Sequence, residues 1–166
     1  MTRIGVLSDT HIPVVAPCLP EEVLDVFERE KVFLILHAGD VVVQKALDQL
    51  LEVAPVMAVR GNMDSPSLQQ ALPIKDIVLV DRTRIGLVHG WGPPQGLAER
   101  VMEAFSGEHV DCIVFGHSHV PVNKRVKNIL LFNPGTPTDT RFTSYKTLGI
   151  LEVEGDQIRG RHVTLP

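Results

Sequence analysis

Residues 112–119 read CIVFGHSH, a short apolar run that ends abruptly in Gly116, His117, Ser118 and His119. Apolar runs of this kind, without polar alternation, predict strands that are covered on both faces. The same arrangement recurs along the chain, and the strands that it predicts are Ile4–Leu7, Val32–Leu36, Val56–Val59, Ile85–Val88 and Ile113–Phe115. Each predicted strand is followed within a few residues by polar side chains.

Helical patterns separate these strands in the first two thirds of the chain. Apolar residues at helical spacing predict a helix after Pro20, a second around residues 43–51 and a third around residues 97–105. From Val120 onward the pattern changes to short strands, at residues 122–126, 129–132, 148–153 and 158–163, the last two joined by a hairpin turn at Gly155. A half built of βαβ units and a half built of hairpins predict an α/β fold with two facing mixed β-sheets and helices outside.

Length and composition predict one globular domain. The 166 residues are 44% hydrophobic and 22% charged, so they can bury a single core, and we expect one domain over residues 1–166 with no cap or accessory domain. The net charge of -4 gives no bulk attraction to nucleic acid, and no apolar run is long enough for a membrane span. Cys18 and Cys112 form no disulfide framework, so a cytoplasmic location is expected.

The polar residues that follow the strands should meet at one site, because ligands of open α/β sheets bind beyond the carboxyl ends of the strands. Oxygen and nitrogen donors predominate among them, and the candidate metal ligands are Asp9, His11, Asp40, Asn62, His89, His117 and His119. Seven donors exceed the needs of one ion. The sequence therefore predicts two divalent cations, and mixed imidazole and carboxylate ligation suits Mn, Fe, Zn, Co or Ni.

Two divalent cations would be only half neutralised by Asp9 and Asp40, which leaves a cationic centre suited to phosphate. Two metals about 3.5 to 4 Å apart generate hydroxide near neutral pH and clamp the attacking and leaving oxygens of an in-line displacement. Phosphoester hydrolysis is the reaction that matches such a centre.

Taken in order, the motifs resemble those of the calcineurin-like metallophosphoesterase superfamily over nearly the whole chain. They are Asp9-x-His11, Gly39-Asp40, Gly61-Asn62-x-Asp64, His89 and Gly116-His117-Ser118-His119. The short length, the Arg60-Gly61-Asn62-x-Asp64 box and the Asn133-Pro134-Gly135-Thr136 turn resemble the small bacterial and archaeal YfcE-like phosphodiesterase branch.

The resemblance implies an αββα sandwich with a dinuclear site, and manganese is the metal it suggests. It implies that one metal is held by Asp9, His11 and His119, that the other is held by Asn62, His89 and His117, and that Asp40 bridges both. The implied activity is a phosphodiesterase that hydrolyses small phosphodiesters by in-line attack of a metal-bridging hydroxide. Asp40, Asn62 and His89 would take part in catalysis, and Asn62 and Arg60 in substrate binding.

Two positions depart from the family pattern. Many phosphatases of the superfamily carry a histidine where this chain has Met63, and use it to protonate the leaving oxygen. Relatives often carry a second histidine where this chain has Trp91. Because both candidate acids are missing, we expect a preference for substrates with good leaving groups, since general-acid help contributes about 10² to 10⁴-fold.

Other polar residues have simpler interpretations. We expect His37 to be a core imidazole or one that supports a ligand, and His109 and His162 to lie at the surface. Asp64 orients Asn62 or the loop, or belongs to a plain turn, and Arg60 makes either a phosphate contact or a salt bridge that holds the metal loop.

Two other function classes stand beside the phosphodiesterase. One is a protein-interaction scaffold on the same fold, like the small subunit of the eukaryotic retromer, which resembles this family but has a compromised metal site. The other is a nuclease, which the acidic balance and the lack of a basic stretch do not favour. The motifs cannot fix the oligomeric state.

Overall fold

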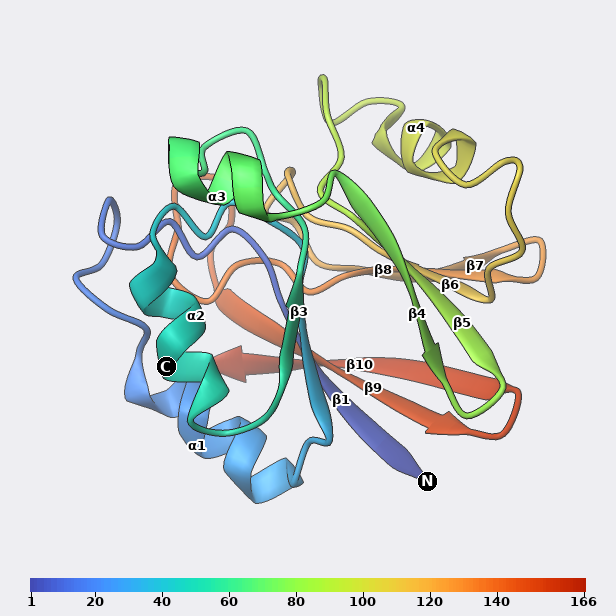
Figure 1. Ribbon diagram of the computed structural model, residues 1–166, viewed down its shortest axis with the longest axis horizontal. Coiled ribbons are helices and arrows are strands. Elements are labelled where there is room, and N and C mark those ends of the chain that lie inside the picture. The colour runs from blue at the N-terminus through green and yellow to red at the C-terminus, as the bar shows by residue number, and fades with distance from the viewer.

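Two five-stranded mixed sheets form the centre of the molecule, and the computed structural model describes all residues from 1 to 166 (Figure 1). The first sheet has the strand order β10 (Gln157–Leu165), β9 (Lys146–Glu154), β1 (Thr2–Leu7), β2 (Leu34–His37), β3 (Val56–Ala58). The second has the order β4 (Lys75–Val80), β5 (Thr83–Val88), β6 (Cys112–Val114), β8 (Ile129–Asn133), β7 (Val122–Val126). The predicted fold class is confirmed.

Both sheets combine parallel and antiparallel pairs. In the first, β1, β2 and β3 run parallel, while β9 pairs antiparallel with both β1 and β10. In the second, β5, β6 and β8 run parallel, while the outer strands β4 and β7 pair antiparallel. The parallel strands therefore direct their carboxyl ends to one edge of each sheet.

Alternation along the strands explains why the predicted runs are continuously apolar. On β2, Leu34 and Leu36 point into the core between the sheets, while Ile35 points out towards the helices on the other face. The helices α1 (Glu21–Glu30) and α2 (Gln44–Leu51) cover that outer face. Because both faces are buried, Leu34, Ile35 and Leu36 are all apolar, and the first polar side chain is His37 at the carboxyl end of the strand.

The second sheet is covered by α4 (Leu97–Glu103), which buries Val101 against Ile113 and Leu131. The short helix α3 (Pro66–Ala71) follows β3 and packs Leu68 against the same core cluster as α1 and α2. None of the helices has the length and apolar character that crossing a membrane requires.

Two elements lie outside the predicted set. β4 is an edge strand on which Leu79 is 63% exposed, so it lacks the continuous burial that marks its neighbours. α3 has six residues, fewer than two turns, which is too short for an apolar period to develop. All the strands and helices that were predicted are present, with ends shifted by a few residues.

Candidate metal centre

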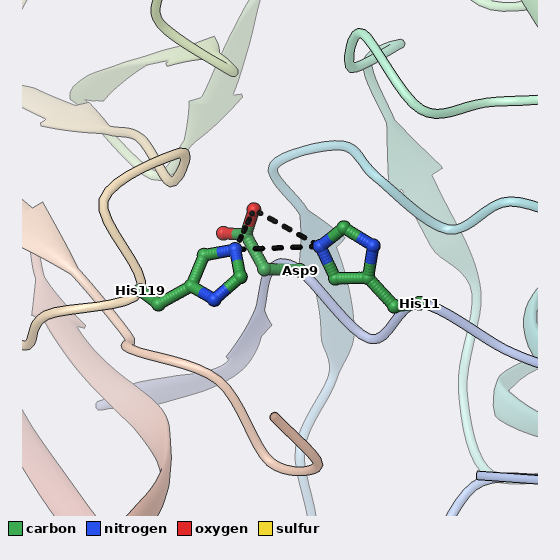
Figure 2. Close-up of side chains that lie close together, drawn as sticks. All are labelled: Asp9, His11 and His119. Atoms are coloured by element: carbon green, nitrogen blue, oxygen red, sulfur yellow. Dashed lines mark hydrogen bonds and ion pairs between the residues drawn. The ribbon is translucent and has the colours of Figure 1, made fainter. Parts of the chain in front are cut away.

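The carboxylate of Asp9 lies at the middle of the site, between the rings of His11 and His119 (Figure 2). Its Oδ1 atom is 3.3 Å from Nε2 of His119, 3.8 Å from Nε2 of His11 and 4.0 Å from Nε2 of His89. The other oxygen, Oδ2, accepts hydrogen bonds from the hydroxyl of Ser8 at 2.6 Å and from the backbone N–H of His117 at 3.0 Å. One oxygen is thus held by the protein and the other faces three imidazoles.

Asp40 divides its two oxygens in the same way. Its Oδ1 accepts a hydrogen bond from the backbone N–H of Met63 at 2.7 Å. Its Oδ2 lies 3.6 Å from Nε2 of His11 and 3.4 Å from Nε2 of His89. Asp40 therefore presents one free oxygen between two histidines from different strand ends.

On the other side of the site, hydrogen bonds to carbonyls determine which ring nitrogens face inward. Nδ1 of His89 donates to the Ala38 carbonyl at 2.7 Å, so in the neutral ring Nε2 carries the free lone pair. Nε2 of His117 donates to the Gly92 carbonyl at 2.8 Å, and its Nδ1 lies 3.4 Å from Nε2 of His89. The oxygen Oδ1 of Asn62 is 3.1 Å from the same His89 nitrogen.

The residues form two overlapping groups whose ligand atoms all lie within 4.8 Å of one another, namely Asp9 with His11 and His119, and Asp9 with Asp40 and His89. Two observations test whether they fit metal ions. The buried Oδ1 of Asp9 has no hydrogen-bond partner, and the Nε2 atoms of His11 and His119 are only 3.3 Å apart. Unpaired buried acceptors are costly, so this donor set fits divalent cations.

The ionisation states of these side chains also favour the binding of divalent cations. Burial raises the pKa of Asp9, but the imidazoles of His11 and His119 outweigh burial and hold that pKa well below its usual range. Burial lowers the pKa of His89, but the carboxylates of Asp40 and Asp9 outweigh it and raise the pKa to about 9. The pKa of Asp40 is likewise lowered by His89 against the effect of burial. Both carboxylates are therefore anionic near neutral pH.

The backbone is strained where the ligands project. Five of the candidate ligands have positive φ angles, namely Asp9 (54°), His11 (48°), Asp40 (57°), His117 (69°) and His119 (61°). Left-handed non-glycine residues are disfavoured by roughly 1 to 3 kcal/mol each and cluster at functional sites.

Two glycines make the close packing around the ligands possible. A Cβ atom on Gly116 would lie 1.8 Å from Oγ of Ser8 and 2.6 Å from Oδ2 of Asp9. A Cβ atom on Gly61 would lie 2.2 Å from Oδ1 of Asp40. At both positions only glycine leaves room for the carboxylates.

Arg60 and Asp64 support the loop after β3 rather than the centre itself. The Arg60 guanidinium donates to the Gln69 carbonyl on α3 and forms no salt bridge, so the predicted ion pair is wrong. The buried carboxylate of Asp64 accepts the backbone N–H groups of Val42 at 2.6 Å and Gly61 at 2.7 Å. Asp64 thus joins two ligand-bearing loops and does not orient the Asn62 side chain.

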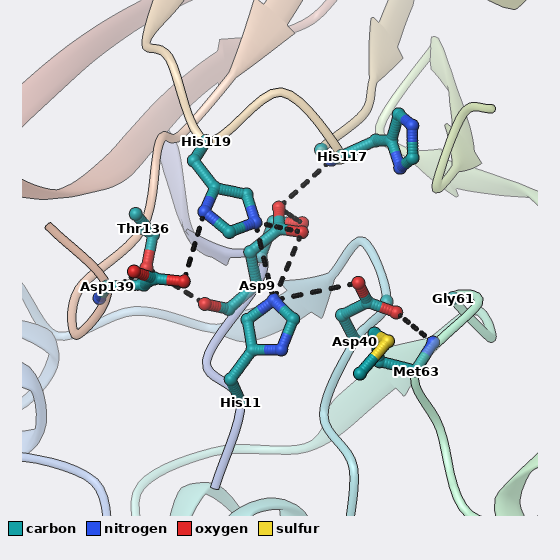
Figure 3. A network of polar contacts seen from close by, with 12 residues as sticks. Asp9, His11, Asp40, Gly61, Met63, His117, His119, Thr136 and Asp139 are labelled. Atoms are coloured by element: carbon teal, nitrogen blue, oxygen red, sulfur yellow. Dashed lines mark hydrogen bonds and ion pairs between the residues drawn. The ribbon is translucent and has the colours of Figure 1, made fainter. Parts of the chain in front are cut away.

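The loop after β8 borders the site (Figure 3). Thr136 donates its hydroxyl hydrogen bond to the Asp9 carbonyl at 2.8 Å, and Asn133 donates to the Gly116 carbonyl at 2.9 Å. Asp139, which sequence analysis did not identify, places Oδ2 at 3.4 Å from Nδ1 of His119. An isolated carboxylate in a loop rich in Pro and Thr carries no pattern that would have revealed it.

The remaining histidines lie outside the ligand set. His37 is fully buried, with its ring nitrogens within hydrogen-bond distance of Thr10 and of the Gly39 backbone, as a supporting imidazole. His109 is exposed as predicted. His162 is half-buried, because its ring stacks on Phe132 at 4.8 Å, and Nε2 donates to the Asn133 carbonyl, so the surface prediction is wrong for this residue.

Comparison with known proteins places the chain among phosphoesterases. The family model of the calcineurin-like phosphoesterase superfamily domain matches residues 2–156. A probable metallophosphoesterase of Methanothermobacter thermautotrophicus is 36% identical over 93% of this chain and 88% of that protein. The phosphodiesterase YfcE of Escherichia coli is 30% identical over 92% of this chain and 88% of its own length.

Solved structures share the architecture. A Thermotoga maritima protein has a TM-score of 0.75 at 30% identity, with 99% of this chain and all of that chain covered. Vps29 of Entamoeba histolytica, at 22% identity, has a TM-score of 0.76 with 98% and 99% coverage, a likeness of fold alone. The fold is thus common to these proteins.

Proposed function

Because the chain belongs to the calcineurin-like phosphoesterase superfamily, we propose that it is a dinuclear metal-dependent phosphodiesterase that hydrolyses small phosphodiesters. The observation that carries the proposal is the unpartnered Oδ1 of Asp9, which is buried among three imidazole nitrogens. A buried acceptor in this position has no role in a purely structural core. It is accounted for when a cation takes up the missing interaction.

Each metal has its own set of residues in this proposal. Asp9, His11 and His119 hold one ion, Asn62, His89 and His117 hold the other, and Asp40 bridges them. Support for the bridge comes from Oδ2 of Asp40, which is 3.6 Å from His11 and 3.4 Å from His89, one residue of each set. Manganese is the proposed metal, although the same donors suit Fe, Zn, Co and Ni.

Two divalent cations at such a site supply a hydroxide nucleophile near neutral pH and neutralise charge in an in-line displacement at phosphorus. The chain itself contributes orientation. Asn62 is exposed, so its amide group is able to meet a phosphoryl oxygen, while its Oδ1 stays beside His89. Arg60 is available to a substrate only through the guanidinium nitrogens that do not donate to Gln69.

No imidazole takes the place of the missing acids at the rim. Met63 and Trp91 are each 49% exposed and carry no group that protonates an alkoxide. The proposal therefore includes a preference for esters whose leaving group departs without a proton donor.

The scaffold alternative is less well supported than the phosphodiesterase. It predicts substitutions among the metal ligands, whereas all seven candidate donors are present in the sequence. Five of them form the two groups described above, and Asn62 and His117 lie beside His89. The nuclease alternative lacks a basic surface in its favour, since the net charge is -4. We also propose a cytoplasmic location, in keeping with two free cysteines.

The test is a hydrolysis assay on protein reconstituted with divalent metals, with an aryl phosphodiester and the matching monoester as substrates. We expect turnover of the diester in preference to the monoester, and a large loss in Asp40→Asn. Asp48→Asn is the matched control, because Asp48 is an exposed carboxylate on α2. The proposal fails if neither ester is hydrolysed with any metal, or if Asp40→Asn is as active as the parent.

A further inference from the structure

The carboxylate of Asp139 is buried behind His119, on the side of the ring away from Asp9 (Figure 3). Its Oδ2 lies 3.4 Å from Nδ1 of His119, while Nε2 of the same ring lies 3.3 Å from Oδ1 of Asp9. The ring is thus placed between two carboxylates, one at the centre and one outside it.

We infer that Asp139 is a positioning residue that fixes the tautomer and orientation of His119, so that Nε2 of the ring faces Asp9. The inference rests on the proposed function, since it assigns a support to one ligand of that centre. A carboxylate behind a metal-binding imidazole accepts a hydrogen bond from the Nδ1 N–H and raises the basicity of Nε2.

Nδ1 of His119 has no other acceptor. The atom is buried and makes no hydrogen bond in this structure, and the carboxylate oxygen Oδ2 of Asp139 lies 3.4 Å from it, at ion-pair distance. The ring of Phe142 also packs edge to face against His119 at 5.1 Å, but it carries no oxygen or nitrogen acceptor. Without Asp139, the carboxylate that remains beside the ring is that of Asp9, which lies at Nε2 and favours the proton on the nitrogen that would face a cation.

Asp139 is itself fixed relative to the metal ligands. Its backbone N–H donates to the Thr136 hydroxyl at 3.0 Å, and that hydroxyl donates to the Asp9 carbonyl at 2.8 Å. The hydroxyl of Thr138 donates to the Thr10 carbonyl at 2.8 Å. Residues 136–139 are therefore attached to the backbone of the loop after β1, and this attachment sets the distance between the two carboxylates.

Arg141 holds the carboxylate from the solvent side. Its Nη2 donates to Oδ2 of Asp139 at 2.6 Å, and its Nε lies 2.9 Å from Oδ1. The backbone N–H of Arg141 also donates to Oδ1 at 3.0 Å, a bond that any residue at this position retains. Replacing the arginine side chain thus leaves Asp139 in place and separates loop anchoring from support of His119.

His119 differs from the other candidate ligands in this respect. The outward nitrogens of His89 and His117 donate to the backbone carbonyls of Ala38 and Gly92. The outward Nδ1 of His11 has no hydrogen-bond partner. Among the four imidazoles, only His119 has a carboxylate behind it, so we expect its nitrogen to be the strongest donor of the set.

The experiment compares the metal-free parent with Asp139→Asn, Asp139→Ala and Arg141→Gln. Calorimetric titration with Mn²⁺ gives the number of ions bound and their affinities, and the visible spectrum of the Co²⁺-loaded protein reports the ligand field. We expect both Asp139 variants to bind one of two ions about 10- to 100-fold more weakly and to shift the Co²⁺ spectrum. Arg141→Gln should match the parent in both readouts.

The inference is overturned if Asp139→Asn retains the affinities and spectrum of the parent. It is also overturned if Arg141→Gln weakens binding as much as Asp139→Asn, because Asp139 would then act only as a loop anchor. Far-UV circular dichroism of each variant checks the fold. A parent that binds two ions and cleaves the diester upholds the proposed function whatever the variants do, whereas a parent that binds no ion overturns both.

Discussion

The Nε2 atoms of His11 and His119 lie 3.3 Å apart in a buried part of the molecule. The lone pairs of two neutral imidazole rings repel each other at this distance. Only a proton or a cation between the two nitrogens removes this repulsion. The unpartnered Oδ1 of Asp9 lies 3.3 Å from one of these nitrogens and 3.8 Å from the other. These three donor atoms thus converge in the manner of a metal-ligand set.

Metal binding should release protons. The pKa of His89 is raised to about 9, because Asp40 and Asp9 outweigh its burial, so the metal-free ring is protonated at neutral pH. A cation requires the neutral ring and must displace that proton. The apparent binding enthalpy of Mn²⁺ at neutral pH should therefore depend on the ionisation enthalpy of the buffer, and the affinity should fall as the pH is lowered. An enthalpy that is equal in all buffers contradicts this expectation.

Acid should destabilise the metal-free protein through His37. Burial lowers the pKa of His37 from 6.5 to about 4, so between these values the unfolded chain binds a proton that the folded chain does not. Stability from the neutral ring is present above pH 6.5 and declines as the pH falls towards 4, by at most about 1.4 kcal/mol per pH unit.

His37→Gln removes this dependence while keeping a polar group near Thr10. Urea titrations on both sides of pH 6.5 give the free energy of unfolding of the parent and the variant. Contributions from the carboxylates cancel in the difference between the two proteins. We expect that difference to shrink on acidification, and a difference that is independent of pH would show that His37 does not titrate in this way.

Gly116→Ala should disrupt both stability and metal binding. The added methyl group would overlap Ser8 and Asp9, so the loop after β6 must move, at a cost of about 1 to 3 kcal/mol. Gly107→Ala is the matched control, because a Cβ atom there meets nothing within 4 Å. Thermal unfolding and Mn²⁺ titration check both variants. Equal behaviour of the two would mean that the close packing at Gly116 is not required.

The substitution Met63→His should speed hydrolysis only of esters with poor leaving groups. The backbone N–H of Met63 donates to Asp40, so an imidazole at this position would stand at the rim of the centre. We expect hydrolysis of diesters with basic leaving groups to rise by up to about 10²-fold, while activated aryl esters change little. The measurement is the slope of log kcat against leaving-group pKa for the parent, Met63→His and the control Met63→Leu. A flat slope in the parent contradicts the missing-acid hypothesis.

The strands and the ligand motifs could be predicted because two strong constraints coincide there. Strands buried on both faces, such as β2, are apolar until their carboxyl ends, so those ends stand out as abrupt changes in polarity. Parallel neighbours then bring those ends to one edge of each sheet. The two sheets face each other, so Asp9 after β1 of the first sheet and His119 after β6 of the second become neighbours in space.

Other features depend on contacts that no local pattern contains. β4 pairs only at the edge of its sheet, and α3 is too short for a period. Asp139 gains its place from hydrogen bonds between two loops more than a hundred residues apart. His162 is covered by Phe132 of the other sheet, and Arg60 donates to Gln69 on a helix that was not predicted.

A crystal structure of the Mn²⁺-loaded protein, with anomalous difference maps at the manganese edge, tests the proposed centre most directly. We predict two peaks, one ligated by Asp9, His11 and His119 and the other by Asn62, His89 and His117, with Asp40 in contact with both. A single peak, peaks away from these side chains, or no peak at saturating Mn²⁺ would contradict a dinuclear centre in this protein.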